Sequence, residues 1–175
     1  MDPEHFLPVM TQPSVLPLVC QLMGPRLQLH TSHLLWRQPN EAARGFGWQT
    51  AAGAQNADDA GDRTDPRELG WHRDIAEMTR VIGVGAMPRV EIKAMYFLSD
   101  CDRPGCGQTW VGRGTHRWQP NEGQAAWAGP AAKERLVAEG RAVEPLLTAG
   151  DCLLFENRCF HSVGVNTSGR VSHGP

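Results

Sequence analysis

The stretch RVEIKAMYFLSD at residues 89–100 constrains the fold most, because its side chains alternate with the two-residue period of a β-strand. The two faces of such a strand would carry Val90, Ile92, Ala94, Tyr96 and Leu98 on one side, and Glu91, Lys93, Met95 and Phe97 on the other. Because both faces carry apolar side chains, we expect a central strand of a sheet. The composition of CDRPGCGQ, which follows, predicts a turn.

The N-terminal part shows a helix pattern and then a strand pattern. The apolar spacing in PSVLPLVCQLMG (13–24) predicts a short amphipathic helix, with Ser14 as its N-cap and Gly24 as its stop. The alternation in RLQLHTSHLLW (26–36) predicts a strand.

Short strands separated by turns account for most of the C-terminal half. TWVGRGTHRW (109–118) predicts a strand that runs into a glycine turn, and residues 121–140 predict a loop and a short helix. The segment AVEPLLTAGDCLLFENRCFHSVGVN (142–166) predicts two strands around the turn AGD. These signals favour an antiparallel sandwich, barrel or jelly roll with one or two short helices.

Residues 40–69 interrupt this pattern with a stretch rich in Ala, Gly, Asp, Gln and Arg. We expect a long flexible loop, and loops of this length usually have a function or are disordered. It is the obvious candidate for a lid over a substrate. The 175 residues are otherwise expected to form a single domain, 1–175.

Composition excludes several classes of protein. The net charge is −2 and no run of Lys or Arg suggests nucleic acid. No apolar stretch is long enough to span a membrane. The N-terminus lacks the basic start and continuous apolar block of a secretory signal. The five cysteines form no CxxC pair, which indicates reduced thiols in an intracellular, cytoplasmic protein. Cys101 and Cys106 are expected at the surface or in a turn.

The segment GWHRDI (70–75) carries the clearest candidate chemistry. On an extended backbone, His72 and Asp74 leave the same face and can reach one cation, although HxD alone is a weak signal and also fits a polar turn. The pair gains weight from His161, which an expected strand, CLLFENRCF, would deliver to the mouth of a barrel. Two histidines and one carboxylate are the facial triad of non-haem Fe(II) oxygenases.

An oxygenase of this kind usually takes electrons from 2-oxoglutarate, whose far carboxylate suits the planar fork of an arginine. Arg170 is the candidate, although it could equally be an exposed loop residue. Thr109 and Lys93 lie on expected strands and could supply further hydrogen bonds to the co-substrate, unless they serve packing or face solvent. Trp71 is expected to pack in the core and His116 to be a turn residue rather than a ligand.

Four segments in this order resemble the phytanoyl-CoA dioxygenase family of Fe(II)/2-oxoglutarate-dependent oxygenases. The resemblance covers roughly residues 13–38 and 70–170 and rests on WHRD, IKAMYFLSDCDRPGCGQTWVGRGTH, AGDCLLFENRCFH and HSVGVNTSGR. It implies a double-stranded β-helix, a jelly-roll, cupin-like barrel. It also implies that iron binds His72, Asp74 and His161, that Arg170 anchors 2-oxoglutarate, and that dioxygen is consumed. Because Asp74 is a carboxylate, halogenation is disfavoured.

The chain departs from the family pattern in three places. Arg113 stands where the family's PGSH segment has proline, Val163 stands where many members have a small hydroxyl residue, and the chain looks truncated at both ends. Two other functions therefore stay open. One is a non-catalytic barrel fragment, and the other is a cupin-type metalloenzyme with different chemistry. The expected partner is a small-molecule substrate whose identity the sequence leaves open, as it does the oligomeric state.

Overall fold

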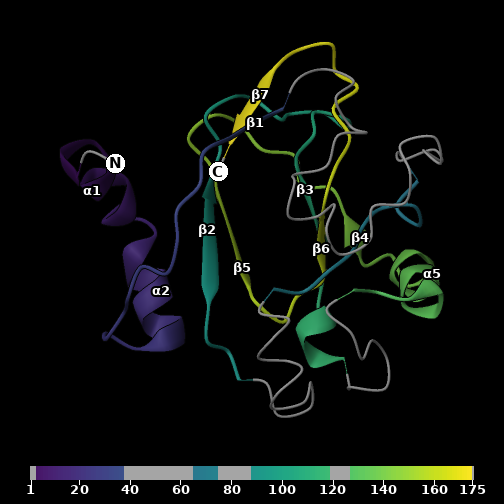
Figure 1. The fold of residues 1–175 in the computed structure, drawn as a ribbon, viewed down its shortest axis with the longest axis horizontal. Coiled ribbons are helices and arrows are strands. Elements are labelled where there is room, and N and C mark those ends of the chain that lie inside the picture. Colours follow the sequence, from purple (N-terminus) through teal and green to yellow (C-terminus); the bar gives the residue numbers. More distant parts are fainter. Residues whose placement is uncertain (1–2, 38–64, 75–87, 119–126, 175) are drawn as a thin grey trace.

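The structure of the protein is a computed structural model that describes residues 3–37, 65–74, 88–118 and 127–174 (Figure 1). Its regular elements, in chain order, are α1 (Pro3–Met10), α2 (Leu16–Met23), β1 (Leu35–Arg37), β2 (Ile92–Tyr96), β3 (Thr109–Gly112), the 3₁₀ helix η3 (Thr115–Arg117), α5 (Pro130–Ala138), β4 (Ala142–Val143), β5 (Cys152–Glu156), β6 (His161–Val163) and β7 (Ser172–Gly174). The expected loop at 40–69 lies outside the described residues, except for 65–69.

The described strands form three antiparallel sheets, which pair β1 with β7, β2 with β5, and β3 with both β4 and β6. The expectation of a mainly β protein with antiparallel pairing is therefore confirmed. The part of the chain that the structure describes shows no closed barrel. The strand expected at 89–100 is present as β2, which lies beside β5 (Figure 1). Its expected central position is wrong among the described strands, because β5 is its one partner there.

One small core lies at the end of β2 and beyond it. Phe97, Cys101 and Cys106 are buried together, with Met95, Leu147 and Leu153 packed against them. The expectation that Cys101 and Cys106 lie at the surface is therefore wrong. Both side chains are buried and act as small apolar residues in this core. All five cysteines are free thiols, as the sequence predicted.

The larger core joins α5 to the segments on either side of the candidate site. It contains Trp71, Leu136 and Phe160, each of which is fully buried, and also Leu69, Trp118, Ala128 and Ala132. Helix α5 contributes through Ala132 and Leu136, which are four residues apart and so lie on one face. The predictions of a helix within 121–140 and of a packing role for Trp71 are confirmed.

The N-terminal region differs most from expectation. Helix α2 is present and ends at Gly24, whose φ of +91° favours glycine. Its N-cap is Val15, so the prediction of Ser14 was wrong. Helix α1 was not predicted, because Pro8 lies inside it and a proline usually interrupts a helix.

The strand expected at 26–36 is wrong except at its end, where β1 begins. Leu29 and Leu34 leave 59% and 67% of their area exposed, so the alternation has no core to face. No helix among the described residues is both long and apolar enough to cross a membrane.

The segment CLLFENRCF is not one strand, which corrects a second prediction. Strand β5 ends at Glu156, and the backbone turns where the amide of Cys159 donates to the carbonyl of Glu156 over 3.0 Å. The buried side chain of Asn157 occupies the turn. His161 is therefore the first residue of β6 instead of the end of β5.

Candidate metal centre

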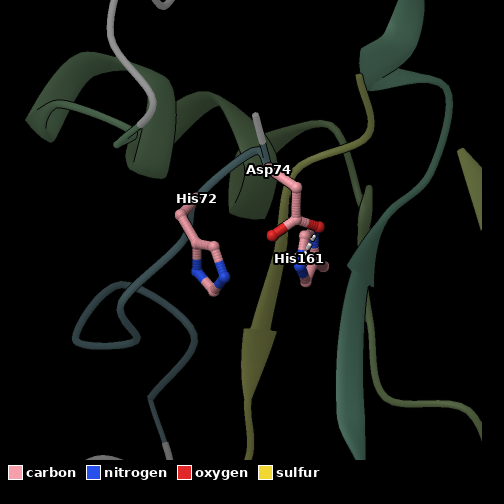
Figure 2. A group of neighbouring side chains, drawn as sticks. All are labelled: His72, Asp74 and His161. Carbon is pink, nitrogen blue, oxygen red and sulfur yellow. Dashed lines mark ion pairs between the residues drawn. The ribbon is translucent and has the colours of Figure 1, made fainter. Parts of the chain in front are cut away.

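His72, Asp74 and His161 lie together, with their ligand atoms all within 4.8 Å of one another. Figure 2 shows the three side chains, two from the segment after Trp71 and one from β6, turned toward a shared space. His72 and His161 are buried, and Asp74 is partly buried. The HxD pair is therefore one side of a three-residue cluster and not a separate polar turn.

Alternation along residues 71–74 explains why the pair faces this space. Trp71 is fully buried in the larger core, and its Nε1 donates to the carbonyl of Pro66 over 2.7 Å. Arg73 is buried too, and its guanidinium lies 4.1 Å from the centre of the Phe160 ring. Because neighbouring side chains on extended backbone leave opposite faces, His72 and Asp74 project away from this core.

Backbone hydrogen bonds tie the two histidines together. The amide of His72 donates to the carbonyl of His161, and the amide of His161 donates to the carbonyl of His72, both over 2.9 Å. This isolated antiparallel bridge places the ring centroids 4.3 Å apart. His72 and His161 are far apart in sequence, and the two backbone hydrogen bonds of this bridge fix the spacing between them.

Thr115 links both ligand-bearing segments and was not recognised from the sequence. Its fully buried hydroxyl donates to the carbonyl of Gly112 over 2.7 Å and accepts the amide of Phe160 over 2.8 Å. Its carbonyl accepts a guanidinium N–H of Arg73 over 2.9 Å. The RGTH turn, residues 113–116, therefore supports the residues that precede His161 and Asp74. The turn itself requires Gly114, whose φ is +77°.

The ring nitrogens of both histidines are oriented for coordination. Nδ1 of His72 lies 2.9 Å from the carbonyl of Gly70, and Nδ1 of His161 lies 3.1 Å from the carbonyl of Cys159. Because a carbonyl only accepts, each Nδ1 carries a proton in these bonds, so Nε2 is the nitrogen that a neutral ring would offer to a metal. Such bonds to the second nitrogen are typical of metal-binding histidines.

Burial and neighbouring charges shift the pKa values of His72 and Asp74. Burial, followed by the neighbouring His161, lowers the pKa of His72 to about 4, so its ring is neutral near neutral pH. Burial alone would raise the pKa of Asp74, but the hydrogen bond and charge of His161 and the charge of Lys93 hold that pKa well below its ordinary value. A neutral imidazole and an ionised carboxylate are the forms that bind metals.

Lys93 places a positive charge directly on Asp74, one of the candidate ligands of this cluster. Its Nζ lies 2.6 Å from Oδ2 of Asp74, and the same oxygen lies 3.1 Å from Nε2 of His161. Lys93 on β2 pairs with Phe155 on the neighbouring strand β5, and the ring centroid of Phe155 lies 4.8 Å from that of His161. The ring of Trp127 stands 5.0 Å from that of His72 and forms another wall.

Thr109 and Arg170 occupy different places. Thr109 is buried on β3 and pairs with Val163, while Val111 pairs with His161, so Thr109 shares the face of the sheet that carries His161. Arg170 is exposed in the bend before β7 and lines a cavity whose other lining residues include Asp102, Arg103 and Ser168. None of the three candidate ligands is among the described residues that line this cavity.

His116, Glu156 and Cys159 form a second group with metal-ligand atoms within 4.8 Å, which the sequence did not predict. The carboxylate of Glu156 is already bound by Arg89 over 2.6 Å and by Arg158 over 2.8 Å. Burial raises the pKa of the Cys159 thiol. A cation would have to displace two guanidinium groups and deprotonate a buried thiol, so this group fits a metal less well than the His72 cluster.

The comparison with protein-family models shows the family of this chain. The family model described as phytanoyl-CoA dioxygenase matches residues 5–174. Among solved structures, the crystal structure of EvdMO1 superposes with a TM-score of 0.51 at 16% sequence identity, covering 95% of this chain and 30% of that one. The chain thus spans less than a third of the length of that protein, and the likeness concerns the fold. No curated protein matches the chain.

Proposed function

Because this chain belongs to the phytanoyl-CoA dioxygenase family, we propose that it is an Fe(II)- and 2-oxoglutarate-dependent dioxygenase. Its reaction would hydroxylate a C–H bond of a small-molecule or lipid-like substrate. The observation that carries this proposal is the convergence of His72, Asp74 and His161, from two separate segments, on one buried space. The family supports an oxygenase in general, and the three residues suggest where its metal is held.

The donor set fits Fe(II). Two imidazoles and one carboxylate form a facial triad that leaves other coordination positions open for a co-substrate and dioxygen. The carbonyls of Gly70 and Cys159 hold the two rings with Nε2 available. Iron bound there would supply the activation of dioxygen that couples oxidative decarboxylation of 2-oxoglutarate, to succinate and CO₂, with hydroxylation of the substrate.

The residues of the chain would bind and orient the co-substrate. Lys93 and Thr109 lie on strands beside the ligands and are proposed to contact the chelating end of 2-oxoglutarate. Arg170 is proposed to bind the distal carboxylate, because its planar guanidinium can form two parallel hydrogen bonds to it. The rings of Phe155 and Trp127 exclude water from the two histidines on either side.

The antiparallel pairing and the family match support a double-stranded β-helix as the finer description of the fold. We propose that residues 1–175 form part of one such domain. The segment 40–69 is proposed as the loop that covers the substrate, since specificity in this architecture depends on loops.

The test is turnover of 2-oxoglutarate without added substrate. The protein, reconstituted with Fe(II) and ascorbate under air, should convert 2-oxoglutarate slowly to succinate, which NMR detects. Asp74→Ala should abolish this reaction. A folded parent that forms no succinate would favour a non-catalytic fragment. Conversion that is unchanged in Arg170→Ala would show that Arg170 does not bind the distal carboxylate of 2-oxoglutarate.

A further inference from the structure

We propose that Lys93 sets the balance between metal and anion at this centre: it weakens binding of the divalent cation and strengthens binding of the 2-oxo acid. This inference rests on the proposed function and adds to it a residue that controls the order of loading. It starts from the contact between Nζ of Lys93 and Oδ2 of Asp74 over 2.6 Å.

The contact is part of the site and not a surface ion pair. The side chains of Lys93 and Asp74 are 31% and 15% exposed, so solvent screens their charges only in part. Strand β2 holds Lys93 opposite Phe155, which packs on His161. Since β2 and β5 pair over five residues on each strand, the lysine stem has a fixed origin beside the ligands.

In the metal-free protein, the ammonium group occupies the position of a counter-cation. It balances the negative charge of Asp74 by contacting Oδ2, the carboxylate oxygen that also lies near Nε2 of His161. An incoming divalent ion must replace this ion pair at Asp74 and then remain near a positive charge. Both effects reduce the affinity for the metal, since like charges at short range in a partly buried site repel strongly.

In the metal-loaded protein, the same charge has the opposite effect on the next ligand. With one carboxylate and two neutral imidazoles, a divalent ion leaves the centre with a net charge of +1, and Lys93 raises it to +2. An anion that chelates the metal through its 2-oxo group and adjacent carboxylate therefore gains a second cation. Lys93 therefore lowers the affinity of the protein for the metal alone and raises the affinity of the metal-loaded protein for the 2-oxo acid.

Lys93 would act on the chelating end of the co-substrate and Arg170 on its distal end. The two roles can be separated with 2-oxobutyrate, which retains the chelating group of 2-oxoglutarate but lacks the distal carboxylate. A change at Lys93 should affect both acids equally. A change at Arg170 should affect 2-oxoglutarate alone.

The experiment uses Mn(II), which avoids oxidation, with calorimetry on the complete chain after removal of metal by a chelator. Each acid is then titrated into the Mn(II)-loaded protein. The variants are Lys93→Met, which keeps the length of the side chain without its charge, and Lys93→Arg, which keeps the charge. Lys133→Met is the matched control, because Lys133 is the one other lysine of the sequence and lies on α5.

We expect Lys93→Met to bind Mn(II) about tenfold more tightly and both acids about tenfold more weakly, which corresponds to about 1.4 kcal/mol in each direction. Lys93→Arg should stay near the parent, and Lys133→Met should match it. Metal or acid affinity that is unchanged in Lys93→Met, or that moves in the same direction for both, overturns the inference while the proposed function stands. A folded parent that binds neither Mn(II) nor 2-oxoglutarate overturns the proposed function itself.

Discussion

Replacement of Thr115 by valine should destabilise the protein and loosen the candidate metal centre together. The hydroxyl of Thr115 accepts the amide of Phe160, the residue directly before His161, over 2.8 Å and donates to the carbonyl of Gly112 over 2.7 Å. Thr115 is 0% exposed, so no water replaces either bond. Valine keeps the shape of the side chain and removes only its hydrogen bonds.

The magnitude follows from the groups left behind. A buried donor or acceptor without a partner costs about 1–3 kcal/mol, and Thr115→Val leaves the amide of Phe160 without the hydroxyl while Gly112 loses one donor. We therefore expect the free energy of unfolding to fall by about 2–4 kcal/mol. Thr115→Ser keeps the hydroxyl and loses one buried methyl group, which costs about 1 kcal/mol.

Urea titrations of the metal-free parent and both variants, followed by circular dichroism, measure these differences. Calorimetry with Mn(II) then measures the effect on the site. Thr115→Val should bind Mn(II) more weakly than the parent, and Thr115→Ser should bind it as the parent does. Equal stability of the valine and serine variants would show that the hydroxyl does not hold the Phe160 segment, and would refute the reasoning.

Two further predictions concern the core and the effect of pH. Leu136→Ala should reduce the free energy of unfolding by about 2–5 kcal/mol, because Leu136 is fully buried, whereas Leu146→Ala, at a site 55% exposed, should change it by less than about 0.5 kcal/mol in the same urea titration. The pKa of His72 is about 4 in the folded protein and 6.5 ordinarily, so the unfolded chain binds a proton first as pH falls. The free energy of unfolding is therefore highest above pH 6.5 and falls progressively toward pH 4. In a chelator, the loss between pH 7 and 5 should be about 2 kcal/mol smaller for His72→Gln than for the parent, and identical losses would contradict the assigned burial of a neutral ring.

The sequence predicted that His72 and Asp74 face one space, because the signal for this pair is local. The pair His72 and Asp74 follows from alternation on extended backbone, and that alternation is strengthened by Trp71 and Arg73, which bury on the opposite face. The alternating run at 89–100 likewise predicted β2, and Met95 and Phe97 on one of its faces pack in a core.

The residues that the sequence missed act through contacts that are distant along the chain. Thr115 lies in a glycine turn, and only the folded chain brings its hydroxyl to the amide of Phe160. The expected strand at 26–36 was wrong for the same reason, because alternation alone does not show whether a partner strand or a core exists. The ion pair of Lys93 with Asp74 also depends on the placement of β2 beside the ligands, which no local pattern contains.

The most direct test of the central claim is an anaerobic titration of the protein with Fe(II) and 2-oxoglutarate, monitored for the visible charge-transfer band of the iron–2-oxo acid chelate. We predict that the band appears in the parent, is lost in Asp74→Ala, and needs more 2-oxoglutarate in Arg170→Ala. A folded parent that shows no band with both ligands in excess would contradict the assignment of His72, Asp74 and His161 as an iron centre.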